Sequence, residues 1–273
     1  MLLLLIFSSF ILVTLVEAVK PLGHRFIWSE QYKPGFGLEY CEIPKTGLTI
    51  TKKMLCDVQK DYKGVPKLFS GPSKLVGFED ECQLIEPFFG KKSASKWRRP
   101  ARNVRFSLVR DPLERFVSLY VFICKGSIAS CPPKAKNNIH QFARWIYGLQ
   151  RTANSQGKPR EGGTNNAFVV FHSWPQTNFC DLKRSRMMIV KVSHDRRKMQ
   201  RKMLRVFRQA HVPERVAKKA LRYFTESSTI HTGRNNGEKR RLLREIRENP
   251  LTMQYLHAMY HEDFRYFKTH RFH

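Results

Sequence analysis

The amino-acid sequence predicts an α/β fold in which a mostly parallel sheet is flanked by helices on both faces. Short apolar runs at residues 38–43, 104–109 and 187–192 are expected to be buried strands. Each run is followed by a segment in which apolar residues recur at helical spacing. Strands that alternate with helices in this way are typical of a parallel sheet covered on both faces.

The other elements are assigned from the same spacing of apolar residues. After an irregular lead-in over residues 19–36, the expected helices are 48–62, a short one near 79–85 inside the loop-rich stretch 63–100, 112–124, 140–150, 196–210, 213–224, and a final helix or helix pair over 238–267. Pro112 suits the first turn of its helix, where a missing N–H costs nothing. The segments 124–138 and 151–166 are expected to be loops.

The N-terminus is expected to direct the chain into the secretory pathway. Residues 2–16 form an apolar run that is shorter than the roughly 20 residues of a membrane-spanning helix, and the small residue Ala18 follows it. Residues 1–18 are therefore interpreted as a cleaved signal peptide, with a short signal-anchor as the alternative. The membrane is then contacted through this segment alone, if it is uncleaved, and a nucleic-acid partner is not expected.

Composition adds two expectations about partners and covalent bonds. The 50 Lys and Arg residues outnumber the 22 Asp and Glu residues, and the formal net charge of +28 favours an anionic partner. Six cysteines, an even number, predict disulfides in an oxidising compartment, although the sequence does not choose among the possible pairings. A Cys-x-x-Cys pair is absent from the sequence, so a zinc site is not favoured and no metal is expected.

The first candidate binding segment is Cys41–Thr51, where the first strand meets its helix. Lys45, Thr46 and Gly47 occupy the turn, and Thr49 lies in the first helical turn. Backbone N–H groups at such a helix start bind phosphate oxygens, which makes the arrangement P-loop-like. The spacing of a Walker A motif is absent, which counts against an ATPase or a kinase. The alternative is an ordinary capped helix with a surface lysine.

The second candidate binding segment is Val104–Tyr120. Its strand ends at Arg110, and a helix that begins at Pro112 carries Ser118. This order places an arginine and a hydroxyl at the carboxyl edge of the sheet, where open α/β folds bind anionic ligands. The alternative is a capped helix in which arginines pair with Asp111 and Glu114.

Taken together, the two segments resemble the Golgi carbohydrate sulfotransferases, in particular the chondroitin- and related-glycan group. The resemblance rests on strand–PKTGxT–helix followed by strand–RDPxxRFxSxY–helix. Weaker likeness is found at three further places, which are His172–Gln176 with Cys180 beyond it, Ile230–Thr232, and Tyr260–Phe267. Leu48 and Thr51 depart from the residues more usual at their positions.

The resemblance implies a sulfotransferase domain over residues 37–273 and the co-substrate 3′-phosphoadenylyl sulfate (PAPS), with no metal. It implies that the 5′-phosphosulfate is held by the first segment and the 3′-phosphate by the second. The implied contacts are Lys45, Thr46, Gly47, Leu48 and Thr49 for the 5′ side, and Arg110 and Ser118 for the 3′ side. It also implies a Golgi-lumenal protein anchored as type II, or a secreted protein if the signal is cleaved.

Sulfuryl transfer to a glycan hydroxyl mainly requires positioned groups and stabilised charge, by analogy with phosphoryl transfer. Lys45 is expected to neutralise the leaving oxygen. A general base, which contributes about 10²–10⁴-fold to such reactions, would remove the acceptor proton. His172 is the first candidate for this base, and His231 and Glu42 are weaker ones.

The acceptor is expected to be an anionic glycan such as chondroitin. The dense Lys and Arg residues between residues 183 and 205 would bind it, although they could also be an ordinary solvated helix face. A second hypothesis keeps the fold but removes the chemistry, so that the chain is a secreted, catalytically silent glycosaminoglycan-binding protein.

Overall fold

The computed structural model describes residues 19–27, 31–64, 95–126, 131–156, 165–183, 186–226, 236–270 and 272. The signal segment at 1–18, the short helix expected near 79–85 and the candidate base His231 lie outside these residues.

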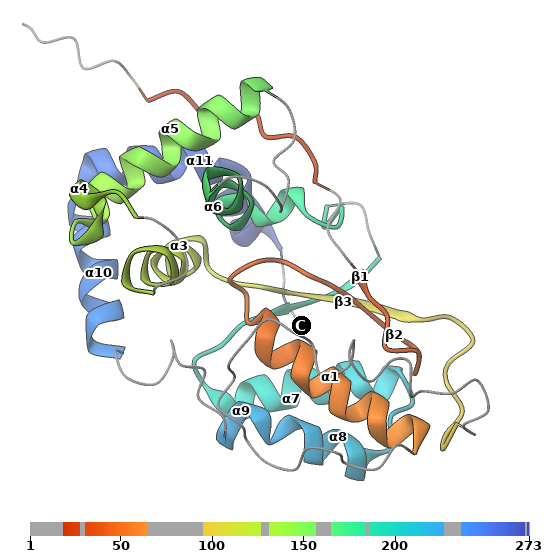
Figure 1. Ribbon diagram of the computed structural model, residues 1–273. Helices are drawn as coiled ribbons and strands as arrows, with labels where there is room; N and C mark the ends of the chain where they lie inside the picture. The colour runs from red at the N-terminus through yellow and green to blue at the C-terminus, as the bar shows by residue number, and fades with distance from the viewer. Residues whose placement is uncertain are drawn as a thin grey trace, which may run out of the picture.

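A four-stranded sheet forms the centre of the molecule, with the strand order β1-β2-β3-β4 (Figure 1). β2 (Leu38–Cys41), β3 (Val104–Val109) and β4 (Met188–Lys191) are parallel. β1 (Gln31–Tyr32) pairs antiparallel with β2 and lies in the stretch expected to be an irregular lead-in. The predicted α/β fold with a mostly parallel sheet is therefore confirmed.

Helices occupy most of the remaining described chain. They are α1 (Leu48–Lys63), α3 (Pro112–Tyr120), the π-helical turn η2 (Val121–Lys125), α4 (Pro133–Lys136), α5 (Ile139–Gln156), α6 (Asn165–Ser173), the 3₁₀ turn η3 (Gln176–Asn178), α7 (Arg196–Gln209), α8 (Glu214–Leu221), α9 (Tyr223–Glu226), α10 (Asn236–Glu248) and α11 (Pro250–Thr269).

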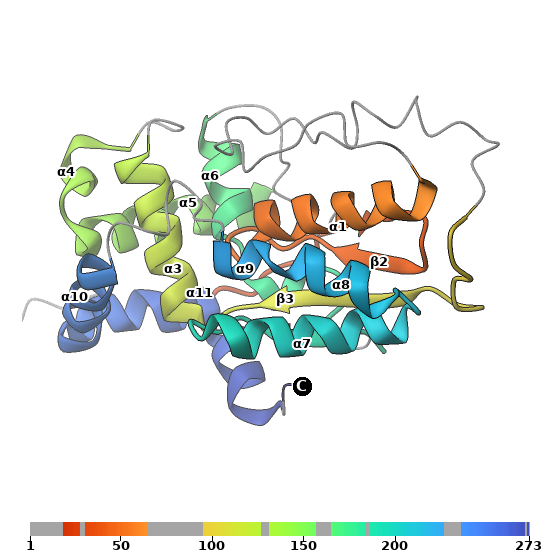
Figure 2. The ribbon, with the colours of Figure 1, turned by 90° about the horizontal axis from the view of Figure 1, so that it is seen from below.

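The two faces of the sheet are covered by different helices, because side chains alternate between faces along each strand. Tyr40, Phe106 and Val190 pack in one cluster with the apolar sides of α1, α7 and α8. On the opposite face, Val109 and Ile189 pack with residues of α6, of the segment after η3 and of α11. Figure 1 shows these two groups of helices on opposite sides of the strands, and Figure 2 shows α1, α7 and α8 gathered around β2 and β3.

Several elements differ from those expected: α4 and the C-terminal end of α5 lie in the segments 124–138 and 151–166, which were wrongly expected to be loops. The helix that begins at Pro112 changes to π-helical geometry at Val121. The final helical stretch is a pair, one of its two expected forms, because the side chain of Asn249 accepts a hydrogen bond from Thr252 N (2.8 Å) and starts α11. α6 is a helix that the sequence pattern did not predict, and most of its second half is buried.

Disulfides are present, as the even number of cysteines predicts. Cys41 at the end of β2 is bonded to Cys180 beyond η3, with 6.1 Å between their Cα atoms. Cys124 in η2 is bonded to Cys131 before α4, with 5.0 Å between their Cα atoms. Cys56 in α1 is also disulfide-bonded. No helix within the described ranges is both long and apolar enough to cross a membrane.

Candidate active site

The turn between β2 and α1 leaves the start of its helix open. Gly47 is the N-cap residue, with φ of 104° in the left-handed region, and no side chain caps the helix there. The Thr46 hydroxyl donates to the carbonyl of Ile43 (2.8 Å), and the Thr51 hydroxyl donates to the carbonyl of Gly47 (3.0 Å). These bonds fix the turn from inside, and the first N–H groups of α1 are left for an anion.

Lys45 lies in the same turn and brings a positive charge beside the open helix start. Its ammonium group lies 3.5 Å from the centroid of the Phe122 ring. Burial, together with the nearby positive charges of Arg110, Arg115 and Lys239, lowers the pKa of Lys45 to about 7. Among the described residues, no carboxylate lies within ion-pair distance of Lys45.

The other predicted residues of this segment differ in their surroundings. Thr49 is exposed in the first turn of α1, and Leu48 is partly buried against the cluster below the sheet. Glu42, a weaker candidate for the base, forms an ion pair with Lys52 (3.1 Å). That pairing stabilises the charged carboxylate and makes it a poorer proton acceptor.

The turn between β3 and α3 holds Arg110 by its backbone. The side chain of Gln176 accepts from Arg110 N (3.0 Å) and donates to Arg110 O (2.7 Å). Arg110 Nε is buried and lies 3.5 Å from Glu114 Oε2, which makes an ion pair but not a hydrogen bond. A buried, unsatisfied cationic donor of this kind is poorly solvated and favours an anionic ligand.

Ser118 shares a helix face with the acidic partner of Arg110. It follows Glu114 by four residues in α3, and residues with this spacing are neighbours on a helix surface. Ser118 is partly exposed. Glu114 also accepts from His194 Nε2 (3.0 Å), so the turn before α7 lies at the same edge of the sheet.

Arg115 connects the two turns. From the sequence, this residue was expected only as a possible ion-pair partner. It is 3% exposed, its Nε donates to the carbonyl of Pro44 (3.0 Å), and its Nη2 donates to the carbonyl of His172 (3.3 Å). One buried guanidinium therefore ties the Lys45 turn, α3 and the end of α6 to one another.

His172 lies at the end of α6 and is almost fully buried. Its Nδ1 lies 2.9 Å from the carbonyl of Phe168, which can only accept, so Nδ1 carries the proton and Nε2 is the free acceptor. Burial, together with the positive charges of Lys45 and Arg115, lowers the pKa of His172 to about 4, although the hydrogen bond to the Phe168 carbonyl opposes the decrease. The imidazole is therefore neutral at pH 7.

Asp263, in the motif near the C-terminus, contacts the segment that holds Arg110. The buried Asp263 carboxylate accepts from Gln176 N (3.0 Å), Thr177 N (2.9 Å) and the Thr177 hydroxyl (2.7 Å). Burial raises the pKa of Asp263, although the positive charge of Arg115 opposes the increase. These bonds hold η3 in place, and with it the Gln176 side-chain amide that hydrogen-bonds to the backbone of Arg110.

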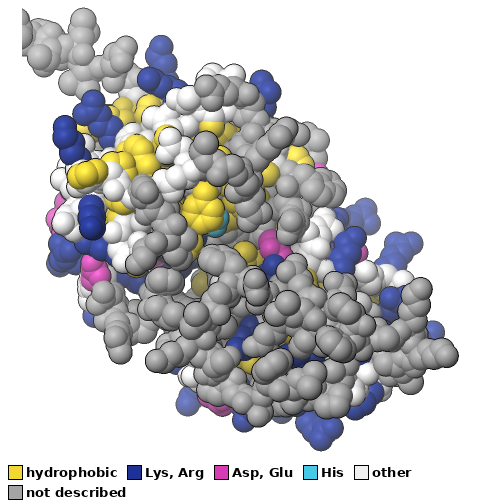
Figure 3. Space-filling view, in the orientation of Figure 1, with side chains coloured by type: hydrophobic (Ala, Val, Ile, Leu, Met, Phe, Trp, Pro, Cys, Tyr) yellow, Lys and Arg dark blue, Asp and Glu magenta, His cyan; other side chains and the backbone are white. Residues whose placement is uncertain are grey.

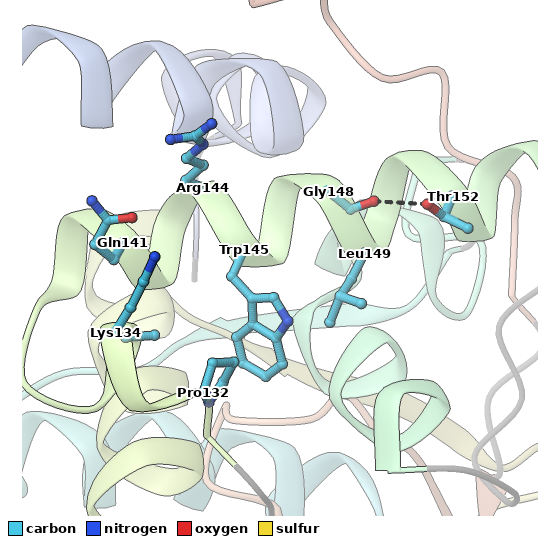
Figure 4. Close-up of a pocket in the computed structure, with 9 residues that line it drawn as sticks. Pro132, Lys134, Gln141, Arg144, Trp145, Gly148, Leu149 and Thr152 are labelled. Carbon is cyan, nitrogen blue, oxygen red and sulfur yellow. Dashed lines mark hydrogen bonds between the residues drawn. The ribbon is translucent and has the colours of Figure 1, made fainter.

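Two other features do not contribute to this site. Within the described ranges, no group of three or more His, Cys, Asp or Glu side chains could hold a metal ion. A hollow between α4 and α5 is lined by Trp145, Lys134 and Gln141, among others, and contains none of the predicted site residues (Figure 4). In Figure 4, Arg144 and Trp145 point to opposite sides of α5.

Comparison with known proteins shows the family to which the chain is similar. The family model described as "Sulfotransferase family" matches residues 26–269 of the chain. A protein of Caenorhabditis elegans, described as uncharacterized, is 26% identical over 243 residues, which cover 85% of this chain and 66% of that protein. The chain thus spans just under two thirds of that relative's length. No solved structure matches the chain significantly.

Proposed function

The chain belongs to the sulfotransferase family, and from this premise we propose that it is a carbohydrate sulfotransferase. It would transfer a sulfuryl group from PAPS to a hydroxyl of a glycan. The acceptor that we propose is a chondroitin-like glycosaminoglycan. Family membership implies PAPS as the donor. The observation that carries the proposal is that Lys45, Arg110 and Arg115 lie close together at one edge of the sheet. All three are buried, and the positive charges of Arg110 and Arg115 lower the pKa of Lys45.

The donor would lie across the two strand-to-helix turns. Lys45, Thr46, Gly47, Leu48 and Thr49 would hold the 5′-phosphosulfate, because the uncapped start of α1 offers backbone N–H groups and the positive end of the helix dipole. Arg110 and Ser118 would hold the 3′-phosphate. The buried Nε of Arg110 supports this assignment, since a phosphate oxygen would supply the acceptor that it lacks.

Lys45 would act on the leaving group. When the acceptor oxygen forms its bond to sulfur, the bond between sulfur and the bridging phosphate oxygen breaks, and the electron pair stays on that oxygen. The Lys45 ammonium would neutralise the charge that develops there. Because Lys45 is buried and has three positively charged neighbours, the binding of an anion beside it would be especially favourable.

His172 would accept the proton of the attacking hydroxyl at Nε2. It is neutral at pH 7, and its Nδ1–H is already used by the carbonyl of Phe168. A bound anionic donor would offset the positive charges that now depress the pKa of His172, which would make it a stronger base during turnover.

An exposed basic stripe on α7 supports an anionic acceptor. Arg197, Arg201 and Arg205 recur every four residues, are exposed, and have no ion-pair partner among the described residues. The stripe begins beside the site, because His194 in the preceding turn contacts Glu114. Figure 3 shows Lys and Arg side chains along much of the outline of the molecule and few acidic ones. A sulfated or carboxylated polysaccharide would match this surface.

Disulfides and family membership are consistent with the secretory pathway, where thiols become oxidised. We place the protein in the Golgi lumen, anchored as type II, or in the secreted fraction if the N-terminal segment is cleaved.

Incubation of the purified protein with radiolabelled PAPS and a panel of desulfated glycosaminoglycans tests the function. Label is expected in desulfated chondroitin, and disaccharide analysis would identify the sulfated position. The catalytically silent glycan-binding protein is the second candidate, favoured by the unpaired arginines of α7. Salt-sensitive binding to heparin or chondroitin, without saturable binding of the nucleotide and without label transfer, would establish that alternative instead.

A further inference from the structure

Phe122 occupies an unusual and firmly held position. It lies in the π-helical turn η2, where α3 widens, and such turns are frequent at functional sites. The turn is closed by a hydrogen bond from Gly126 N to the carbonyl of Val121 (3.1 Å) and is anchored by the Cys124–Cys131 disulfide. The Phe122 ring is 6% exposed.

The ring carries the closest cation–ring contact in the described part of the chain. Lys45 Nζ lies 3.5 Å from its centroid, whereas the other such contacts lie between 5.1 and 6.0 Å. The Lys45 backbone is held in the left-handed region, with φ of 67°, which is uncommon for a residue with a side chain. The turn therefore directs the ammonium group toward the ring.

The charged groups around Lys45 cannot hold its ammonium by themselves. Arg110 approaches from the turn after β3, Arg115 from α3 and Lys239 from α10, and all three are positive. The neutral imidazole of His172 lies on α6, with its ring centroid 5.5 Å from that of Phe122. The electron-rich face of Phe122 is thus the favourable partner that the structure provides for this cation.

We propose that Phe122 is a positioning residue that holds the Lys45 ammonium in a resting place until the nucleotide binds. The inference rests on the proposed function, since it assumes that Lys45 serves a phosphosulfate. A cation–π contact is weaker than a desolvated ion pair, so an arriving phosphosulfate would draw the ammonium away from the ring. When the nucleotide product leaves, the ammonium returns to Phe122.

The proposal predicts how the pH dependence changes when the ring is removed. The ring favours the charged form of Lys45, so Phe122→Leu lowers the pKa of Lys45 below its present value of about 7. Because activity needs the ammonium, the alkaline limb of kcat/KM for PAPS, which reports the free enzyme, moves to lower pH by about half a unit or more. The alkaline limb of kcat stays in place, because the donor holds the ammonium in the complex. Phe122→Tyr keeps a ring and restores the wild-type profile.

Phe168→Leu is the matched control. Phe168 also packs on the His172 ring, at 4.1 Å between centroids, and within the described chain it has no cation over its face. Its substitution would reduce thermal stability without moving the kcat/KM limb. Equal movement of the limb in both leucine variants, or none in Phe122→Leu, overturns the proposal.

A second measurement separates this inference from the proposed function. The rate at which acetic anhydride acetylates Lys45 in the nucleotide-free protein, followed against pH by mass spectrometry, reports the pKa of Lys45 without any turnover. A lower pKa in Phe122→Leu than in wild type and Phe122→Tyr is expected. An unchanged pKa rejects the resting place even in an active enzyme. A lowered pKa in a protein that transfers no label from PAPS rejects the sulfotransferase function instead.

Discussion

The two strand-to-helix turns at the carboxyl edge of the sheet have the same topology, but the helix after the first turn starts without a side-chain cap and the helix after the second starts with one. After β2, α1 begins at Gly47 with no side-chain cap and no acidic residue in its first turn. After β3, the Asp111 carboxylate accepts from Leu113 N (3.0 Å) and Glu114 N (3.2 Å), and so closes the start of α3. The third such turn is also closed, because Asp195 accepts from Lys198 N at the start of α7 (2.9 Å).

If PAPS binds as proposed, this difference gives one sheet edge two unlike anion sites. At the open turn, backbone N–H groups and the helix dipole are available, and one mobile lysine adds charge. At the closed turn, a carboxylate already occupies the helix start and repels a second anion. An anion bound there would have to be held by side chains, for which we propose Arg110 and the hydroxyl of Ser118, one turn beyond Glu114.

The largest effect is expected at the open turn. Lys45→Ala removes the positive side-chain charge of that turn and would lower kcat for sulfuryl transfer by about 10²–10³-fold, as loss of a charge-stabilising donor does in other enzymes. The unfolding temperature should change little, because Lys45 has no ion-pair partner among the described residues. Full activity of this variant would remove Lys45 from the catalytic group. Steady-state kinetics with radiolabelled PAPS provide the measurement.

A smaller effect, on binding, is expected at the closed turn. Arg110→Ala would weaken PAPS binding by about 10- to 100-fold, the usual result of losing a charge-assisted hydrogen bond. Isothermal titration with the product nucleotide would measure this loss. Arg105→Ala is the control, because Arg105 lies in β3, the strand that precedes Arg110, is 42% exposed and pairs with Glu39. Equal affinities of the two variants would contradict a phosphate site at Arg110.

The smallest effect is expected at the cap itself. Asp111→Ala leaves the first N–H groups of α3 without their acceptor and should lower the free energy of unfolding by about 1 kcal/mol. Asp111→Asn should retain most of the stability, because an asparagine side chain caps about as well. Urea denaturation would compare the two. If the alanine variant were as stable as wild type, the contrast between the turns would not depend on capping.

Local patterns predicted the sheet and most helices well, for reasons that particular segments make clear. β3 has the bounds expected from its apolar run, because Arg110-Asp111-Pro112 ends the strand and starts a helix in three residues. α6 was missed because Ala167–Ser173 is apolar almost throughout and has no clear helical period. The structure buries that segment on nearly all sides, so the missing period is a consequence of its position.

The candidate site was predictable only in part. Turn residues such as Lys45, Gly47 and Arg110 could be found, because strand ends and helix starts have local signals. Their supports could not be found, because they are made across the fold. The side chain of Arg115 reaches carbonyls at Pro44 and His172, and Gln176 reaches the backbone of Arg110 from a separate turn. No local spacing encodes such contacts.

The Cys41–Cys180 bond turns much of the chain into a covalent ring, since the two cysteines are 139 positions apart. Lys45, Arg110, Ser118 and His172 all lie inside that ring. A protease that cuts once between the two cysteines would therefore leave both fragments joined, with every proposed donor contact still tethered to its neighbours. The ring makes the site a single mechanical unit that a broken backbone cannot by itself take apart.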